Sequence, residues 1–156
     1  MLIRNAEVRD IPGMIELLKQ VGEVHHVIRP DIFRSGALKY NETDLEAILA
    51  DPTRPIFVAV EGGFVAGYCF CVHKLSQGDS VLMDSRELYI DDLCVDEGCR
   101  GQGVAKALYA HTLEYAKKSG CDAITLNVWN GNDTALRFYE KAGFTPRKTM
   151  MEVKFC

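Results

Sequence analysis

The sequence lacks the features of a membrane protein, a secreted protein or a nucleic-acid-binding protein. No apolar run approaches the roughly 20 residues that a membrane-spanning helix needs. The first residues enter a strand pattern at once, so we expect no cleaved secretion signal. Basic residues are in the minority, since 18 Lys and Arg stand against 22 Asp and Glu and the formal net charge is -4. Such a chain has no basic footprint for nucleic acid, so we expect a cytoplasmic protein that binds neither nucleic acid nor membrane.

The six cysteines have no spacing typical of a metal or redox site. None of them forms a Cys-x-x-Cys pair, and their neighbours are mostly apolar. We therefore expect reduced, buried thiols and no disulfide. His25 and His26 are adjacent but have no further ligands at a suitable spacing, so we expect them to be loop residues and expect no metal site.

The sequence also has no linker, repeat or low-complexity tract that would divide it. Its 156 residues suit one domain that buries roughly 70% of its unfolded surface, so we expect a single domain over residues 1–156. Apolar periods of 2 and 3.6 alternate, which indicates an α/β or α+β fold. The expected strands are residues 2–8, 56–60, 64–73, 87–95, 123–129 and 150–155. The expected helices are one capped by Asp10 and ended by Gly22, residues 42–50, one from residue 104 to about Ser119 and Gly120, and residues 134–142.

One short segment carries most of the chemical information. An arginine and two glycines join an apolar strand to a long amphipathic helix, in the run Arg100, Gly101, Gln102, Gly103, Val104 and Ala105. Glycines let backbone amides approach an anion closely, and a helix N-terminus presents unpaired N–H groups at the positive end of its dipole. Arg100 adds a fixed positive charge. The segment therefore predicts a phosphate-binding turn.

Spacing argues against two common phosphate-binding motifs. A P-loop places Lys and then Ser or Thr directly after its last glycine, whereas Val104 and Ala105 follow Gly103 here. A dinucleotide-binding fingerprint needs a third glycine at the position of Lys106 and usually opens an N-terminal βαβ unit. This turn instead lies two thirds of the way along the chain. Nucleoside triphosphates and dinucleotides are therefore disfavoured as ligands.

The pattern that remains is an arginine, two spacers, a glycine, one spacer, and then glycine or alanine. Arg100, Gly103 and Ala105 follow it, strand residues 90–95 precede it, and residues 132–144 come after it. In this order the three segments resemble the GNAT superfamily of acyl-CoA-dependent N-acetyltransferases. The resemblance covers residues 86–145 well and the first 50 residues only in outline. It implies a layered α+β fold, in which helices flank a mostly antiparallel mixed central sheet, and it implies acetyl-CoA as cosubstrate.

The resemblance assigns each segment a part in binding CoA. Amides of the glycine turn and the Arg100 region would hold the pyrophosphate at the helix N-terminus. The pantetheine arm would lie like an added strand along the strand before the turn. Asn132 would lie near this arm, or it would serve only as a helix cap. The expected cofactor-binding residues are Leu93, Cys94, Val95, Arg100, Gly101, Gln102, Gly103, Val104, Ala105 and Asn132.

The resemblance also implies how the chemistry is divided. Tyr139 matches the family's common general acid, which protonates the departing CoA thiolate. An amine must be neutral to attack, and Asp91 or Asp92 would take its proton, directly or through water. Analogy with relatives favours Asp91. Strand alternation sends the two acids to opposite faces unless a bulge intervenes, and both could equally serve only in salt bridges.

A rival mechanism would pass the acyl group through the Cys94 thiolate. No histidine lies at a readable activating distance in the sequence, and an apolar strand raises the pKa of a thiol. Direct attack by the amine in a ternary complex is therefore favoured. Tyr139 and Asp91 are the expected catalytic residues.

The acceptor amine is left open by the sequence. Residues 29–33 lie where relatives form one wall of the acceptor site, although Ile32 and Phe33 could simply anchor a proline-directed turn. A small amine, a polyamine, an amino acid, an aminoglycoside and a protein amine all fit. Dimers are frequent among relatives, so a homodimer is one expected assembly. The alternative function, from a different class, is a non-catalytic CoA-binding sensor or interaction module on the same fold.

Overall fold

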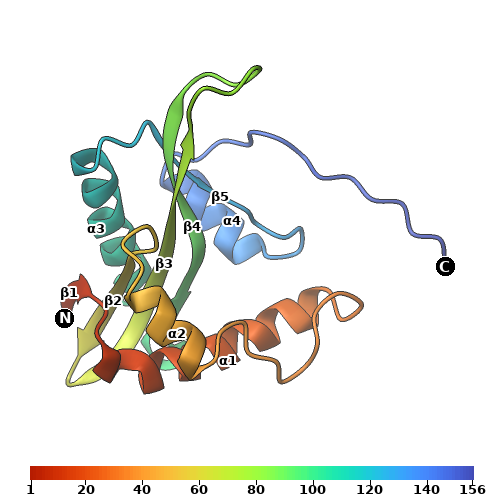
Figure 1. The fold of residues 1–156 in the computed structure, drawn as a ribbon. Helices are drawn as coiled ribbons and strands as arrows, with labels where there is room; N and C mark the ends of the chain where they lie inside the picture. The colour runs from red at the N-terminus through yellow and green to blue at the C-terminus, as the bar shows by residue number, and fades with distance from the viewer.

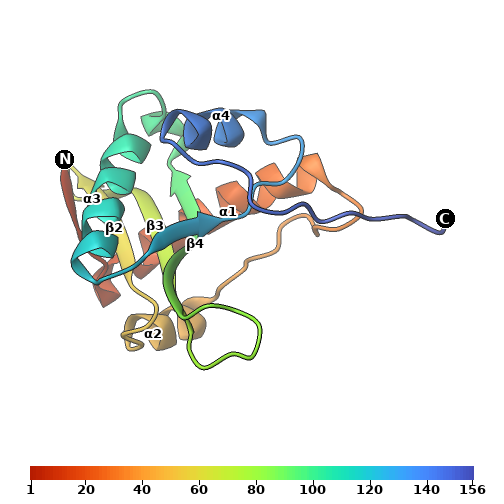
Figure 2. The ribbon, with the colours of Figure 1, turned by 90° about the horizontal axis from the view of Figure 1, so that it is seen from above.

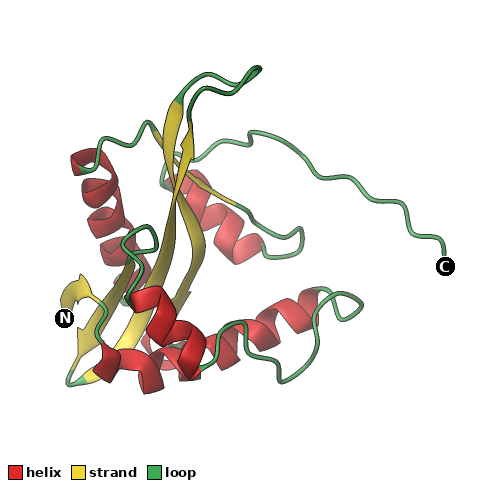
Figure 3. Cartoon of the chain, viewed as in Figure 1, coloured by secondary structure: helices red, strands yellow, loops and turns green.

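The structure, a computed structural model, describes residues 1–156 and contains one five-stranded sheet (Figures 1 and 3). The strands lie side by side in sequence order: β1 (Leu2–Asn5), β2 (Ile56–Glu61), β3 (Phe64–Ser76), β4 (Ser85–Val95) and β5 (Ala123–Leu126). Neighbours from β1 to β4 pair antiparallel, whereas β5 runs parallel to β4. The predicted mixed and mostly antiparallel sheet is therefore confirmed.

Helices cover both faces of this sheet (Figure 2). α1 (Ile11–Ile28) and α2 (Glu42–Leu49) pack on one face around Met14, Leu45 and Tyr68. α3 (Val104–Lys118) packs on the other face through Leu108 and Ala116. The short 3-10 helices η1 (Val8–Asp10) and η2 (Glu97–Cys99) stand before α1 and α3, and α4 (Asp133–Lys141) follows β5. Each long helix buries one apolar stripe, which gives the layered α+β fold that the sequence predicts.

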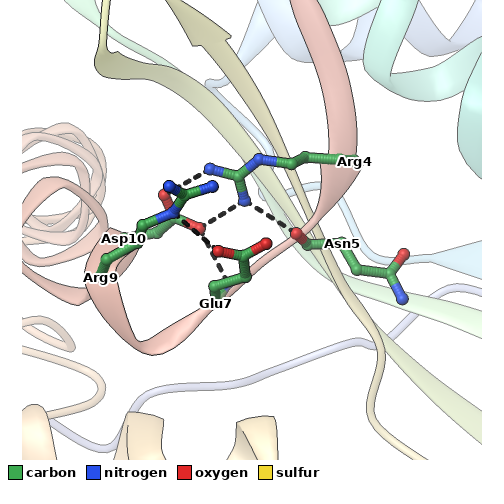
Figure 4. A network of polar contacts seen from close by, with 5 residues as sticks. All are labelled: Arg4, Asn5, Glu7, Arg9 and Asp10. Carbon is green, nitrogen blue, oxygen red and sulfur yellow. Dashed lines mark hydrogen bonds and ion pairs between the residues drawn. The ribbon is translucent and has the colours of Figure 1, made fainter.

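The start of α1 is tied to β1 by an ion pair that the sequence does not reveal (Figure 4). Asp10 is buried, and its carboxylate accepts hydrogen bonds from Arg4 Nη1 at 2.7 Å and Arg4 Nη2 at 3.0 Å. The same carboxylate accepts a third bond from the backbone N–H of Glu7 at 2.8 Å. Asp10 does occupy the N-cap position of α1, but its side chain makes no bond to the helix amides. The predicted side-chain cap is therefore wrong, and Asp10 instead closes the turn between strand and helix.

Gly22 does not end α1, contrary to the prediction from sequence. The helix continues through it to Ile28. A Cβ built at Gly22 would lie 3.0 Å from the backbone O of Ala37, so the missing side chain lets the segment between α1 and α2 approach the helix. A helical glycine can serve such a close approach instead of a helix end.

The C-terminal part of the chain differs most from the predicted elements. β5 ends at Leu126 and not at Trp129, and residues 150–155 form no strand within the chain. Cys156 is exposed and Cys121 half-buried, so the expectation of buried thiols fails for these two and holds for Cys69, Cys71, Cys94 and Cys99. None of the helices combines the length and the hydropathy that crossing a membrane requires.

Candidate functional site

The site begins where β4 and β5 separate. Their parallel pairing runs from Glu87 with Ala123 to Ile90 with Leu126, and then it stops. β4 continues to Val95 and remains paired with β3 on its other side. Residues 91–95 therefore have an open backbone edge, which includes the predicted ligand-binding residues Leu93, Cys94 and Val95. An extended ligand can add to such an edge as a strand would.

The glycine turn lies directly after this open edge. Gly101 and Gly103 have φ angles of 75° and 81°, in the left-handed region that residues with a side chain avoid. Gly103 is the N-cap of α3 and supplies no side chain to the first helix amides. These amides are free to bind an anion at the positive end of the helix dipole, and the exposed Arg100 lies in the same turn.

Gln20 of α1 fixes the path of the turn, a role that sequence reasoning missed. Its Nε2 donates to Asp96 Oδ1 at 2.9 Å, and its Oε1 accepts from the backbone N–H of Glu97 at 3.0 Å. Asp96 in turn accepts from the N–H of Gly98 at 2.9 Å. Because the two partners lie 76 residues apart in sequence, no local pattern could have identified this contact.

The N-terminus of α3 is pressed closely against the sheet at Gly67 of β3. A Cβ built there would lie 3.0 Å from the backbone O of Cys94 and 3.0 Å from the side chains of Val104 and Leu108. Gly67 therefore allows the helix that carries the turn to lie directly on β3 and β4. The open edge of β4 and the amides of α3 are held together as one surface.

A β-bulge brings the two acidic residues to one face of the sheet. In the pairing of β3 with β4, Phe70 opposes Asp92 while Cys71 opposes Ile90, so Asp91 is an extra residue. Strand alternation alone would have placed the acids on opposite faces, and the bulge removes that restriction. Asp92 lies beside Tyr68 and Asp91 beside Tyr40, both of which pack with the core on the α1 and α2 side.

Asp92 is bound to a buried tyrosine of β3. The buried Tyr68 donates a hydrogen bond from its hydroxyl to Asp92 Oδ2 at 2.6 Å. Burial raises the pKa of Asp92 to about 6, even though the Tyr68 hydrogen bond and the charge of Lys39 act in the opposite direction. The residue still keeps some contact with solvent. A carboxylate with this pKa can accept a proton near neutral pH.

Asp91 is bound to the segment that leads into α2. It accepts from Lys39 Nζ at 3.0 Å and from the Tyr40 hydroxyl at 2.6 Å. Arg54 Nη2 donates to the Tyr40 oxygen at 3.0 Å. Burial and the bond to Asp91 raise the pKa of Tyr40 to about 12, so Tyr40 remains a donor at neutral pH. Salt-bridge partners, which the sequence left as an alternative for the acids, are therefore present for Asp91.

Tyr139 of α4 is buried, with only 8% of its surface exposed. Its ring meets Phe138 and Phe144 edge to face, with centroids 5.2 Å and 5.4 Å apart. The Tyr139 hydroxyl has no hydrogen-bond partner in the protein. Every fully buried side-chain oxygen and nitrogen does have a partner, so the Tyr139 hydroxyl must be in contact with solvent. Burial, with smaller effects from Cys69 and Asp92, raises the pKa of Tyr139 and keeps its proton in place.

Asn132 is the N-cap of α4, but its side chain makes no capping bond and is half-buried. Cys94 directs its buried thiol toward the backbone O of Leu17 at 3.6 Å, and burial raises its pKa to about 12. A thiol with that pKa is protonated at neutral pH and is a poor nucleophile.

His25 and His26 lie in the last turn of α1, so the prediction that they are loop residues is wrong. His25 stacks on Phe33 at 4.9 Å between ring centroids, and His26 Nδ1 lies 2.7 Å from the Phe33 carbonyl O. Phe33 also meets Trp129 edge to face at 5.0 Å. No three His, Cys, Asp or Glu side chains lie close enough together to hold a metal ion. The segment after α1 and the chain after β5 therefore meet through aromatic rings.

The comparisons with known proteins agree with this geometry. The model of the Acetyltransferase (GNAT) family matches residues 22–144. A mutant of the BH1408 protein from Bacillus halodurans has a solved structure that superposes with a TM-score of 0.96, at 31% identity and over 100% of both chains. The Thialysine N-epsilon-acetyltransferase of Bos taurus is 24% identical over 91% of this chain and 82% of its own length.

Other curated relatives match over a shorter stretch. The Acetyltransferase Atu2258 of Agrobacterium fabrum is 45% identical over 58 residues, which are 37% of this chain and 41% of that protein. The next relatives are matched over 59% and 56% of their own lengths. The chain thus spans about half the length of the curated relatives that it matches first.

Proposed function

Because the chain belongs to the GNAT acetyltransferase family, we propose that it transfers an acetyl group from acetyl-CoA to a primary amine by direct attack. The observation that carries this proposal is the open edge of β4, which leads without interruption into the glycine turn at the start of α3. An extended arm and its terminal phosphates need these two features next to each other. In CoA, the pantetheine and the pyrophosphate are joined in that order.

In this proposal the two parts of CoA are bound by backbone groups. Amides of Gln102, Gly103, Val104 and Ala105 hold the pyrophosphate together with the charge of Arg100 and the turn at Gly101. The pantetheine lies along Leu93, Cys94 and Val95 of β4. Asn132, whose side chain makes no capping bond, is free to donate to the pantetheine amides from the opposite side.

The acetyl transfer itself forms one C–N bond and breaks one C–S bond. The neutral amine attacks the thioester carbonyl carbon, and a backbone N–H of β4 donates to the oxygen as negative charge develops there. The tetrahedral intermediate collapses with departure of the CoA thiolate. The amine nitrogen loses one proton, and the thiolate gains one.

We assign the base to Asp92 in preference to Asp91, which analogy favoured. A pKa of about 6 keeps Asp92 ionised at neutral pH and leaves it a stronger base than an ordinary aspartate. Asp91 is already bound by Lys39 and Tyr40. In this account Asp91 orients the segment before α2.

Tyr139 is the proposed general acid for the thiolate. Its raised pKa keeps the hydroxyl protonated, and its hydroxyl has no competing partner in the protein. A simple thiol has a pKa of about 8.5, so its thiolate leaves readily and the proton mainly assists release. Tyr139 should therefore affect turnover more than binding.

The experiment is a measurement of free thiol release from acetyl-CoA across a panel of small amines, polyamines, amino acids, aminoglycosides and peptides. An acetylated product with at least one class supports the proposal and identifies the acceptor. Tight CoA binding without turnover on any class would instead support a non-catalytic CoA-binding sensor.

A further inference from the structure

Lys39 lies beside the two acids of β4 and has hydrogen-bond donors that the protein does not use. Its Nζ donates to Asp91 Oδ1 at 3.0 Å and makes no other hydrogen bond in the protein. An ammonium group has three N–H donors, so two remain free. The Lys39 side chain is 48% exposed, whereas that of Asp91 is only 16% exposed. Lys39 therefore presents a positive charge and free donors to a ligand that approaches β4.

The backbone that carries Lys39 is fixed on both sides of this residue. Before it, Glu23 of α1 accepts from the backbone N–H of Gly36 at 2.8 Å. After it, the Tyr40 hydroxyl donates to Asp91 at 2.6 Å. A charged group on a fixed backbone loses less conformational freedom when a ligand binds than one on a free loop. Lys39 is therefore suited to select a ligand by its charge.

The Lys39 charge acts on groups from both α1 and β4. Burial, followed by this charge, lowers the pKa of His25 in the last turn of α1, which keeps the imidazole neutral above pH 7. The same charge acts on Asp92, where it opposes the larger effect of burial on the pKa. His25 stacks on Phe33, which in turn meets Trp129. Lys39 thus lies near both the proposed base and an uncharged group of aromatic rings.

The charges around the proposed base balance one another. Asp91 and Asp92 are negative, whereas Lys39 and Arg54 are positive, and Arg54 reaches Asp91 through the Tyr40 hydroxyl. A ligand with a second ammonium group would find Asp91 already paired and would be repelled by Lys39. A carboxylate would find the two free Lys39 donors. A phosphate group, with more negative charge, would be repelled more strongly by the two acids.

We propose, building on the proposed acetyltransferase function, that the acceptor is a free amino acid and that Lys39 binds its carboxylate while Asp92 takes the proton of its amine. Asp91 holds the Lys39 ammonium in place for this contact. Lys39 then determines specificity in two ways, because it attracts a carboxylate and repels a second ammonium group. Polyamines and aminoglycosides, which carry several ammonium groups and no carboxylate, are poor acceptors.

The test compares each free amino acid with the amine that remains when its carboxylate is replaced by hydrogen, for example lysine with cadaverine. Polyamines and aminoglycosides are assayed beside these pairs. The best acceptor should be an amino acid, with kcat/KM at least about tenfold higher than that of its decarboxylated partner. Equal rates within the pairs, or a best acceptor without a carboxylate, overturn the proposal and leave the acetyltransferase function standing. Acetylation of no amine at all overturns that function, and this proposal with it.

Variants of Lys39 separate recognition of the carboxylate from a structural role. Lys39→Met removes the charge and should raise KM for the amino acid at least about tenfold, with kcat changed less than about threefold. It should not lower kcat/KM for the decarboxylated partner. Lys39→Arg should keep the preference for the carboxylate, because the positive charge remains.

Lys118→Met is the matched control. Lys118 is also an exposed lysine paired with a carboxylate, that of Glu114 at 2.8 Å, but it lies at the end of α3 on the other face of the sheet. This variant should leave the preference unchanged. If Lys39→Met weakens the amino acid and its decarboxylated partner equally, Lys39 has only a structural role and the proposal is wrong.

Discussion

At the scale of single residues, the proposed mechanism depends on two groups, Asp92 and Tyr139, whose pKa values are raised mainly by burial. Tyr68 and the core beneath it hold Asp92, and the aromatic side chains around α4 hold Tyr139. One group is left able to accept a proton near neutral pH, and the other keeps its proton. Pairs of titratable groups whose environments push their roles apart are typical of acid–base catalysis.

Replacing Tyr139 by Phe should lower kcat by about 10- to 100-fold, because the thiolate must then take its proton from water. The change removes one hydroxyl and leaves the buried ring, so binding of CoA should change less than about threefold. Steady-state kinetics and calorimetric titration with CoA would measure the two effects. A loss of CoA affinity equal to the loss of turnover would assign Tyr139 to binding.

The dependence of kcat/KM on pH should show an acidic limb near pH 6. Activity requires ionised Asp92, so the rate should rise as the pH passes through the Asp92 pKa of about 6. Asp92→Asn should lower the rate about 100-fold and abolish this limb. Asp91→Asn is the matched control and should keep it. If Asp91→Asn removes the limb and Asp92→Asn retains it, the base is Asp91.

Asp92 should also reduce stability at neutral pH. Its pKa is raised on folding, so between the unfolded value near 4 and the folded value of about 6 the folded protein binds the proton more tightly. Raising the pH through this window therefore lowers the free energy of unfolding. Asp92→Asn should be about 2 kcal/mol more favourable to stability at pH 8 than at pH 4, by urea unfolding. An equal effect at both pH values would show that the Asp92 carboxyl is not perturbed.

At the scale of elements, the site is made by places where regular pairing ends. β4 continues beyond the end of its pairing with β5. A β-bulge in β4 turns the side chains of Asp91 and Asp92 to one face of the sheet. The N-cap of α3 is a glycine, which provides no side chain to bind the first amides of the helix. Each irregularity leaves backbone groups available for a ligand. The close contact at Gly67 and the Gln20 bonds then hold the elements in place.

Gly103→Val should weaken CoA binding at least about tenfold, since a β-branched residue disfavours a φ of 81° and its side chain blocks the approach of phosphate. Gly78→Val is the control, because Gly78 has a φ of 68° in the β3–β4 loop and open space around it. Both variants should lose similar stability. Unchanged CoA affinity in Gly103→Val would refute the pyrophosphate assignment.

The sequence predicts elements better than it predicts their ends. Hydrophobic period and turn residues identify α2, β2, β3, β4 and α3, because local propensity and tertiary contacts agree there. They fail at Gly22 and Asp10, where a contact with Ala37 and a bond to Arg4 decide the local structure. They fail again at residues 150–155, which have a strand pattern but pair with no strand of the same chain.

The site was predictable to a similar extent. The glycine turn is local and is predicted from spacing, whereas the left-handed φ angles of Gly101 and Gly103 are seen only in the structure. Gln20, Tyr68 and Tyr40 were not found, since each acts on a residue at least 24 positions away. The orientation of Asp91 and Asp92 required the β-bulge, which depends on pairing with β3 and has no signal in the β4 sequence alone.

At the scale of the whole molecule, the proposed CoA site takes up one part of the chain, and the acceptor site is expected in another. The residues proposed to hold CoA lie from β4 through α3 to α4, within the stretch matched by the family model. Residues 29–33, which the resemblance places at one wall of the acceptor site, contact the chain after β5 through Phe33 and Trp129. Binding of the donor should therefore be separable from the choice of acceptor.

The most direct test of the central claim is an initial-velocity experiment that varies acetyl-CoA and an accepted amine together. If the amine attacks acetyl-CoA directly within a ternary complex, double-reciprocal plots should intersect, and no acetylated protein should be found by mass spectrometry when the amine is withheld. Parallel lines, together with an acetyl group on the protein, would contradict direct transfer and show that the acetyl group passes through a covalent intermediate.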